Sequence, residues 1–323
     1  MSLSTRTAQR EKVLAPAAAT LSPRSEPDLT AAIPRGTIEQ LQLGHVICDF
    51  LRQEIFQNLC TTWLTNDEQR FHHVITLNPE MVMAAESNIP FRQALQQAKL
   101  RVPDGAGLIW AQWFIRSQFW SLIPSLIAFS FRDVERITGV DTVWLLARLC
   151  ARFDHPLYLL GGTAREVERT ATLLRDALPS LQVHTSADHT YNLEGPAEIL
   201  ADIRHRAPAV LLVAYGAVKQ TLWIERHKQE LPSVRIAVGV GGAFSILSEE
   251  KPRAPRILRQ FNLEWLWRLL LEPSRLPRIW QATVRFPLLI QRQKAADPPL
   301  FASPDTQSTP ATPPLDKQDT AAR

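Results

Sequence analysis

Residues 74–80 (VITLNPE) predict a β-strand that runs directly into an α-helix. Val74 and Ile75 are β-branched and favour the strand. Asn78 is a good helix N-cap, and the proline that follows it suits the first helical position. Thr76 and Asn78 therefore lie where a strand ends and a helix begins, which is the usual ligand edge of an open α/β sheet.

The same arrangement returns about one helix later, in residues 102–105 (VPDG). Asp104 follows a short apolar segment on a turn bounded by proline and glycine. Pro-Asp-Gly is common turn chemistry, so an aspartate in this setting is most often only a turn former. Because it is expected at the same sheet edge as Thr76 and Asn78, we interpret Asp104 as a candidate catalytic base beside a ligand pocket at that edge.

Predicted strands alternate with predicted helices along the chain. This alternation is typical of an α/β fold with right-handed crossovers. We expect a Rossmann-like, mostly parallel sheet flanked by helices, with a basic helical C-terminal appendage. The predicted strands are 37–43 (or a turn), 72–77, 100–102, 156–160, 181–185, 209–215 and 234–240. The predicted helices are 49–58, 80–97, 107–114, 142–153, one from 163, 196–206 and 221–230.

Several predicted strands end in glycine, and we take Gly161, Gly162, Gly216, Gly241 and Gly242 as candidate ligand-binding positions. Backbone N–H groups at such turns can face a nucleotide diphosphate. The alternative is a set of ordinary strand-to-helix turns. Residues 239–244 (GVGGAF) also resemble half of a dinucleotide fingerprint but lack its third glycine, which makes a nicotinamide oxidoreductase a weak alternative. Lys219 and Gln220 follow another strand and could reach phosphate or sugar hydroxyls; the alternative is an exposed helix start.

Charge and composition divide the chain into four parts. Residues 1–36 and 295–323 lack periodicity and read as a disordered arm and a disordered Pro-rich tail, on either side of an α/β core at 37–250. Residues 251–294 hold ten Lys/Arg against two Glu, a net charge of +8, whereas the whole chain carries +4. Arginines here alternate with Trp and Leu, which favours a membrane surface over a nucleic acid as the anionic partner.

Residues 115–132 are mostly apolar but too short to span a bilayer. A buried helix or hairpin is one reading. A segment lying in the membrane interface, anchored by Trp113, Trp120 and the flanking arginines, is the other. The three widely spaced cysteines, the absence of a secretory signal and the absence of a long apolar run indicate a cytoplasmic protein.

Six motifs occur in a fixed order and together resemble the WecG/TagA/CpsF glycosyltransferases (glycosyltransferase family 26), over roughly residues 40–290. The resemblance implies transfer of an N-acetylmannosamine-type sugar from a UDP-sugar to the 4-hydroxyl of a polyprenyl-diphosphate-linked N-acetylglucosamine, with inversion and with no metal or other cofactor. It also implies a peripheral position on the inner face of the cell membrane, and leaves a homo-oligomer open. The motifs are TLNPEMVMAAESNIPFRQALQQAKLRVPDGAGLIWA, RITGVD, LYLLGGTAREVE, GAVKQTLWIERHKQELP, GVGGAFSIL and RAPRILRQFNLEWLWRLLLEPSR.

Site residues follow from the resemblance position by position. Asp104 becomes the base, with Thr76 and Asn78 near the acceptor sugar, and Gln220 at the donor or acceptor sugar. Asp141 of the RITGVD motif joins Lys219 and the glycines as a donor- or acceptor-binding residue. The arginines expected to bind the diphosphate are Arg253, Arg256, Arg259 and Arg268.

The chain departs from the family pattern on the donor side. Val218 replaces a proline, Thr221 replaces a glutamate, and residues 244–246 (FSI) replace Phe-Asp-Phe. These changes allow a different reading, a non-catalytic partner in polysaccharide assembly at the membrane. The intact Asp104 favours an active enzyme.

Overall fold

The computed structural model describes residues 37–66, 70–119, 121–130, 137–186, 197–249, 255, 258 and 264–296. The predicted arm at 1–36 lies outside these residues, and so does all but the start of the predicted tail at 295–323. The division of the chain into four parts therefore stays a prediction.

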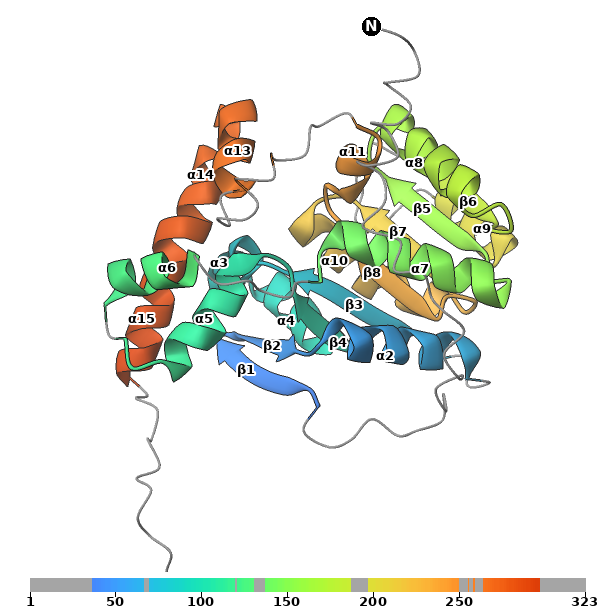
Figure 1. Cartoon of the computed structure of the whole chain (residues 1–323). Coiled ribbons are helices and arrows are strands. Elements are labelled where there is room, and N and C mark those ends of the chain that lie inside the picture. The colour runs from blue at the N-terminus through green and yellow to red at the C-terminus, as the bar shows by residue number, and fades with distance from the viewer. Residues whose placement is uncertain are drawn as a thin grey trace, which may run out of the picture.

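Six parallel strands form the central sheet, with helices on both faces (Figure 1). The mostly parallel α/β architecture predicted from the alternating pattern is confirmed. All six carboxyl ends lie at one edge because every pairing in the sheet is parallel. In spatial order the strands are β4 (Leu100–Pro103), β3 (His72–Leu77), β8 (Ile236–Gly239), β7 (Val210–Ala214), β5 (Leu157–Gly161) and β6 (Val183–Ser186).

The two faces of the sheet are covered by different helices, because alternate side chains of a strand point to opposite faces. Leu159 and Leu212 pack in one hydrophobic cluster, and Leu160 and Leu211 pack in another. The first face carries α2 (Gln53–Thr65), α7 (Gly139–Phe153), α8 (Ala164–Ala177) and α11 (Ala243–Leu247). The second carries α3 (Pro79–Ser87), α4 (Ile89–Gln97), α9 (Ala197–Arg206) and α10 (Ala217–His227), which ends in the short η1 (Lys228–Glu230).

An antiparallel hairpin, β1 (Glu39–Leu43) and β2 (Val46–Phe50), precedes the sheet. The predicted helix at 49–58 is wrong at its start, because Asp49 belongs to β2 and α2 begins only at Gln53. The buried Asp49 carboxylate accepts hydrogen bonds from the Arg101 backbone N–H at 2.8 Å and from its guanidinium at 2.9 Å. This long-range ion pair holds the end of β2 against β4, and no local pattern reveals it.

The helix predicted over 80–97 is two helices, α3 and α4, which meet at Asn88. The Asn88 side chain accepts a hydrogen bond from the Phe91 N–H and caps α4. Pro90 has no N–H to continue the first helix, so it sits in the first turn of the second.

The apolar segment at 115–132 forms the end of α5 (Ala106–Arg116) and then α6 (Leu122–Ser130). One side of α6 is buried: Phe129 packs on the ring of Trp113, with ring centroids 6.0 Å apart. The other side is open, and Ile123 is 72% exposed. The buried side agrees with the buried-helix reading, whereas the membrane-interface reading stays a prediction and its anchor Trp120 lies outside the described residues.

The C-terminal part packs on α3, α5 and α6, as Figure 1 shows. Phe286 and Ile290 are fully buried in the cluster that also holds Phe114 of α5. The buried Lys294 ammonium donates to the backbone carbonyls of Phe114, Ser117 and Phe119 at 2.6–2.8 Å. Its elements are α13 (Glu264–Leu271), η2 (Pro273–Arg275), α14 (Leu276–Trp280), the π-helical segment η3 (Gln281–Arg285) and α15 (Phe286–Ala296).

His72 and His73 are buried in β3 and bond to Arg235 and Glu225, away from the carboxyl edge, which is typical of histidines with a structural role. His73 Nδ1 lies 2.6 Å from the Glu225 carboxylate. Burial favours a raised pKa for Glu225, but the hydrogen bonds and charges of His73 and Lys228 outweigh it and hold the pKa below its ordinary value.

The three cysteines are free and buried, and burial raises the pKa of each thiol. Within the described part of the chain, no helix combines the length and apolar character needed to cross a bilayer.

Candidate active site

The ends of β3 and β4 bring Asp104 next to Asn78. The two strands pair in parallel, with Leu77 opposite Pro103, so the residues that follow them lie side by side. The Asp104 backbone N–H donates to the Leu77 carbonyl at 2.6 Å and fixes the start of the turn. The two motifs that the sequence placed at one edge therefore meet there.

Two helix N-termini converge on this point. Asn78 caps α3, and its side-chain oxygen accepts the Met81 N–H at 3.0 Å. Gly105 caps α5 with a φ of +97°. A Cβ at Gly107 would lie 2.7 Å from the Pro79 ring, so only glycine lets α5 begin so close to α3. Helix N-termini carry partial positive charge and free N–H groups, which suits an anionic ligand beside Asp104.

Thr76 and Asn78 already make bonds within the fold. The buried Thr76 hydroxyl donates to the Gly239 carbonyl at 3.1 Å and ties β3 to β8. Asn78 uses its oxygen as the helix cap, which leaves the amide N–H groups as the part that can donate to a sugar. These hydrogen bonds hold the strand ends and the start of α3 in place. A contact of Thr76 or Asn78 with an acceptor sugar stays a prediction.

Gln220 joins α10 to the turn after β8. Its Oε1 accepts the Gly241 N–H at 3.0 Å, and a Cβ at Gly239 would meet its side chain at 2.4 Å. The side chain is 3% exposed. Gln220 therefore holds the Gly241 turn in place through this hydrogen bond. The neighbouring Lys219 is exposed on the same helix.

Most of the candidate glycines take backbone conformations that favour glycine. Gly161, Gly162, Gly216 and Gly241 have φ values of +86°, +74°, +86° and +53°. They follow β5, β7 and β8, which are adjacent in the sheet. Because β5 leads into α8 on one face and β7 into α10 on the other, the space between these strand ends is a topological switch point, where open α/β sheets bind ligands.

Gly161 gives a test of this edge. An alanine there would need a φ of +86° and would place its Cβ 2.9 Å from the Tyr215 ring. We expect Gly161→Ala to lower the free energy of unfolding by roughly 1–3 kcal/mol, measured by urea denaturation. Gly242→Ala is the control, because Gly242 has a φ of −84° and no atom within 4 Å of the added methyl group. Equal losses in the two variants would contradict the strain at Gly161.

A cluster that the sequence did not assign lies beside Gly162. The Glu166 carboxylate accepts the Thr163 N–H at 2.8 Å, completing a capping box at the start of α8, and also accepts the Ser245 hydroxyl. The capping pattern was visible locally, but Ser245 is 79 residues away. The serine that departs from the family pattern thus ties α11 to α8.

Asp141 belongs to the first turn of α7. Its carboxylate accepts the Thr138 hydroxyl at 2.6 Å, and its N–H donates back to that oxygen at 3.2 Å. Gly139 packs against the Val240 carbonyl, so this turn lies next to the end of β8. The carboxylate is engaged in capping α7, and a contact of Asp141 with donor or acceptor stays a prediction.

The side chains of the predicted diphosphate-binding arginines are not described, so the structure does not place them relative to this edge. Arg253, Arg256 and Arg259 lie outside the described residues, and Arg268 is on α13 with a side chain that is not described. Among the described residues, no group of three or more His, Cys, Asp or Glu is arranged to hold a metal ion.

A model of the WecG/TagA/CpsF glycosyl transferase family matches residues 43–298. The chain belongs to this family. It is therefore a glycosyltransferase, and the similarity predicted from the ordered motifs is confirmed.

Two curated relatives carry the same name, N-acetylglucosaminyldiphosphoundecaprenol N-acetyl-beta-D-mannosaminyltransferase. The protein from Bacillus spizizenii is 24% identical over 256 residues, which is 78% of this chain and 92% of the relative. The protein from Staphylococcus aureus strain NCTC 8325 is 25% identical over 218 residues, 68% of this chain and 79% of the relative.

Proposed function

We propose that this glycosyltransferase moves an N-acetylmannosamine-type sugar from UDP to the 4-hydroxyl of a polyprenyl-diphosphate-linked N-acetylglucosamine, with inversion and without a metal ion. The observation that carries the proposal is the placement of Asp104 beside Asn78, at a sheet edge where two helix N-termini converge. The names of the two relatives support the choice of acceptor and of transferred sugar.

Asp104 acts as the base. Its carboxylate takes the proton of the acceptor hydroxyl as that oxygen attacks the anomeric carbon of the donor. The new C–O bond forms while the bond from the anomeric carbon to the UDP oxygen breaks, and UDP leaves with the electron pair. One displacement by one base inverts the anomeric centre. General-base help of this kind contributes roughly 10²–10⁴ in rate.

The remaining requirement is to stabilise the charge on departing UDP. The turns at Gly161 and Gly216 can offer backbone N–H groups at the switch point between β5 and β7, and the Gly241 turn after β8 is next to them. Lys219 is exposed on the helix that starts at one of these turns. We expect the arginines between residues 251 and 268 to complete the diphosphate site, so that fixed dipoles and guanidinium groups take the role that a metal has in other transferases.

The membrane is the expected place of work, on its cytoplasmic face, because the acceptor is a lipid. Exposed large apolar side chains support this location: most of those in the described chain gather on α6, on the turn before it and on the C-terminal helices. They are Phe119, Ile123, Leu126, Leu270, Leu271, Leu276, Trp280 and Leu288.

A panel of UDP-sugars tests the proposal. Each is incubated with the protein and a polyprenyl-diphosphate N-acetylglucosamine, in the presence of EDTA, and released UDP is measured. We expect release that depends on the acceptor and is fastest with UDP-N-acetylmannosamine. No acceptor-dependent release with any donor would support the non-catalytic assembly partner instead, and release that EDTA abolishes would contradict metal independence.

A further inference from the structure

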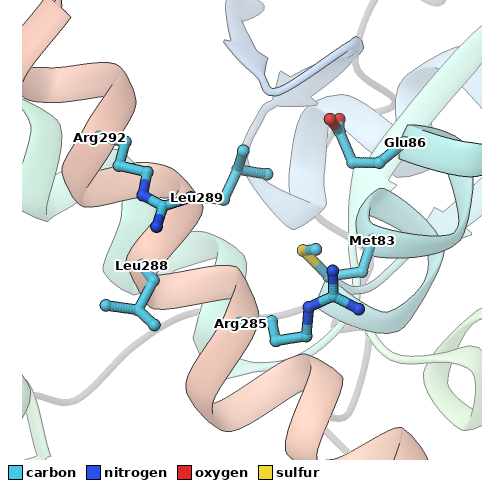
Figure 2. A pocket seen from close by; sticks show the side chains of 6 residues that line it. All are labelled: Met83, Glu86, Arg285, Leu288, Leu289 and Arg292. Carbon is cyan, nitrogen blue, oxygen red and sulfur yellow. The ribbon is translucent and has the colours of Figure 1, made fainter.

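A groove of about 420 Å³ lies between α3 and the C-terminal helix (Figure 2). Its lining combines apolar side chains, two guanidinium groups and one carboxylate. These six residues are Met83, Glu86, Arg285, Leu288, Leu289 and Arg292. The sequence predicted a membrane contact for the basic segment 251–294 as a whole but assigned no role to these individual side chains, and they are not part of the edge that holds Asp104.

The charges in the groove are not balanced within it. The Glu86 carboxylate is engaged by the hairpin turn, since it accepts the His45 N–H at 3.1 Å and lies 3.2 Å from the His45 ring nitrogen. Arg285 and Arg292 have no carboxylate partner among the described residues, whereas Arg275 earlier in the segment pairs with Glu272. Two cationic groups are therefore left facing an apolar floor.

The helix is held so that this face is presented to α3. The π-helical segment η3 ends at Arg285, and η3 packs on α3. π-helical turns within α-helices are often found at functional sites. Arg285 and Arg292 are seven residues apart and so lie on one face, roughly 10 Å apart along the axis. At the far end of the helix, the three bonds from Lys294 to the α5–α6 turn fix its position.

Apolar side chains continue outward from the groove. Leu288 is 41% exposed, Trp280 one turn before the groove is 56% exposed, and Leu126 on the adjacent α6 is 39% exposed. Tryptophan and leucine beside exposed arginines are typical of helices that lie in a lipid headgroup region. We propose that the groove binds the headgroup of an anionic phospholipid, with Arg285 and Arg292 on its phosphate side and Met83 and Leu289 against its glycerol and upper acyl carbons.

The position of the groove favours a membrane phospholipid over the lipid acceptor. Met83 is at the middle of α3 and Glu86 is in its last turn, whereas Asn78 caps its start with Asp104 beside it. The inference rests on the proposed function only in taking the membrane as the place of work.

Methionine methyl groups give a direct readout, because the chain has only three methionines. Met83 lines the groove, while Met81 on the same helix is 1% exposed and serves as an internal control. The full-length protein with ¹³C-methyl methionine is titrated with dihexanoyl phosphatidylglycerol, below its micelle concentration, and followed by NMR. We expect a saturable shift of the Met83 signal and an unchanged Met81 signal, and no comparable shift with dihexanoyl phosphatidylcholine.

The double variant Arg285→Gln/Arg292→Gln should lose the Met83 shift and bind phosphatidylglycerol vesicles about 30-fold more weakly, which corresponds to about 1 kcal/mol per arginine. The control Arg148→Gln/Arg226→Gln removes the same charge from exposed positions on α7 and α10. It should keep the Met83 shift and the affinity for phosphatidylglycerol vesicles. An equal response to the neutral lipid, equal loss in the control, or a Met83 shift only with a prenyl diphosphate would overturn the proposal. Vesicle binding without transfer from any UDP-sugar would refute the proposed function alone.

Discussion

Asp104→Asn should lower the turnover of sugar transfer by about 10²–10⁴ while the protein folds normally. The asparagine keeps the size of the side chain and leaves the backbone bond from residue 104 to the Leu77 carbonyl in place. It cannot take a proton from the acceptor hydroxyl at neutral pH. The measurement is single-turnover transfer to a lipid-linked acceptor, with unfolding by urea to establish the fold.

Asp176→Asn is the matched control, because Asp176 is exposed on α8, away from β3 and β4. We expect it to transfer at the wild-type rate. The effect of Asp104→Asn should fall on the rate of the chemical step more than on donor binding, since the base acts in the transition state. Turnover within about threefold of wild type would remove Asp104 from the role of base.

The largest effect on stability is expected for Phe286→Ala. Phe286 is fully buried at the start of α15, in the cluster that holds Trp110 and Phe114. Removing a buried phenyl group typically costs about 3–5 kcal/mol, measured here as the free energy of unfolding in urea. Leu270→Ala on α13 is the control: Leu270 is 67% exposed, and its loss should stay within about 0.5 kcal/mol.

Because α15 is part of the hydrophobic core, a C-terminal deletion removes core side chains as well as charge. A chain cut before Lys251 would lose not only the basic segment but also Phe286, Ile290 and the Lys294 bonds to the α5–α6 turn. Loss of transfer in such a deletion would report an opened core as much as a missing diphosphate site. A Phe286→Ala protein as stable as the wild type would show instead that α15 is a detachable helix.

Local patterns predicted the architecture and the central geometry of the site. Strand-to-helix transitions at residues 74–80 and 102–105 were readable because β-branched residues, an N-cap and turn residues follow one another directly. Since parallel strands end at one edge, Asp104 and Asn78 could be expected to meet, and they do. The glycines that follow the predicted strands could be assigned to turns at the same edge, and four of them have positive φ values.

Long-range pairings were not predictable. Local sequence placed Asp49 in a helix. The ion pair with Arg101 that holds it in β2 links positions 52 residues apart, so no local pattern could reveal it. Gln220 could be read as a ligand contact, but its bond to the Gly241 N–H gives it a structural role that only the folded chain reveals. The groove at Arg285 and Arg292 likewise depends on two helices that are distant in sequence.

The anomeric configuration of the lipid product tests the central claim most directly. The product formed from UDP-N-acetylmannosamine is purified, and its sugar linkage is determined by NMR. A single displacement assisted by Asp104 predicts a β-linkage to the 4-oxygen of N-acetylglucosamine from the α-linked donor. An α-linked product would require a double displacement or attack from the side of the leaving UDP, and would contradict the single inverting displacement proposed for this site.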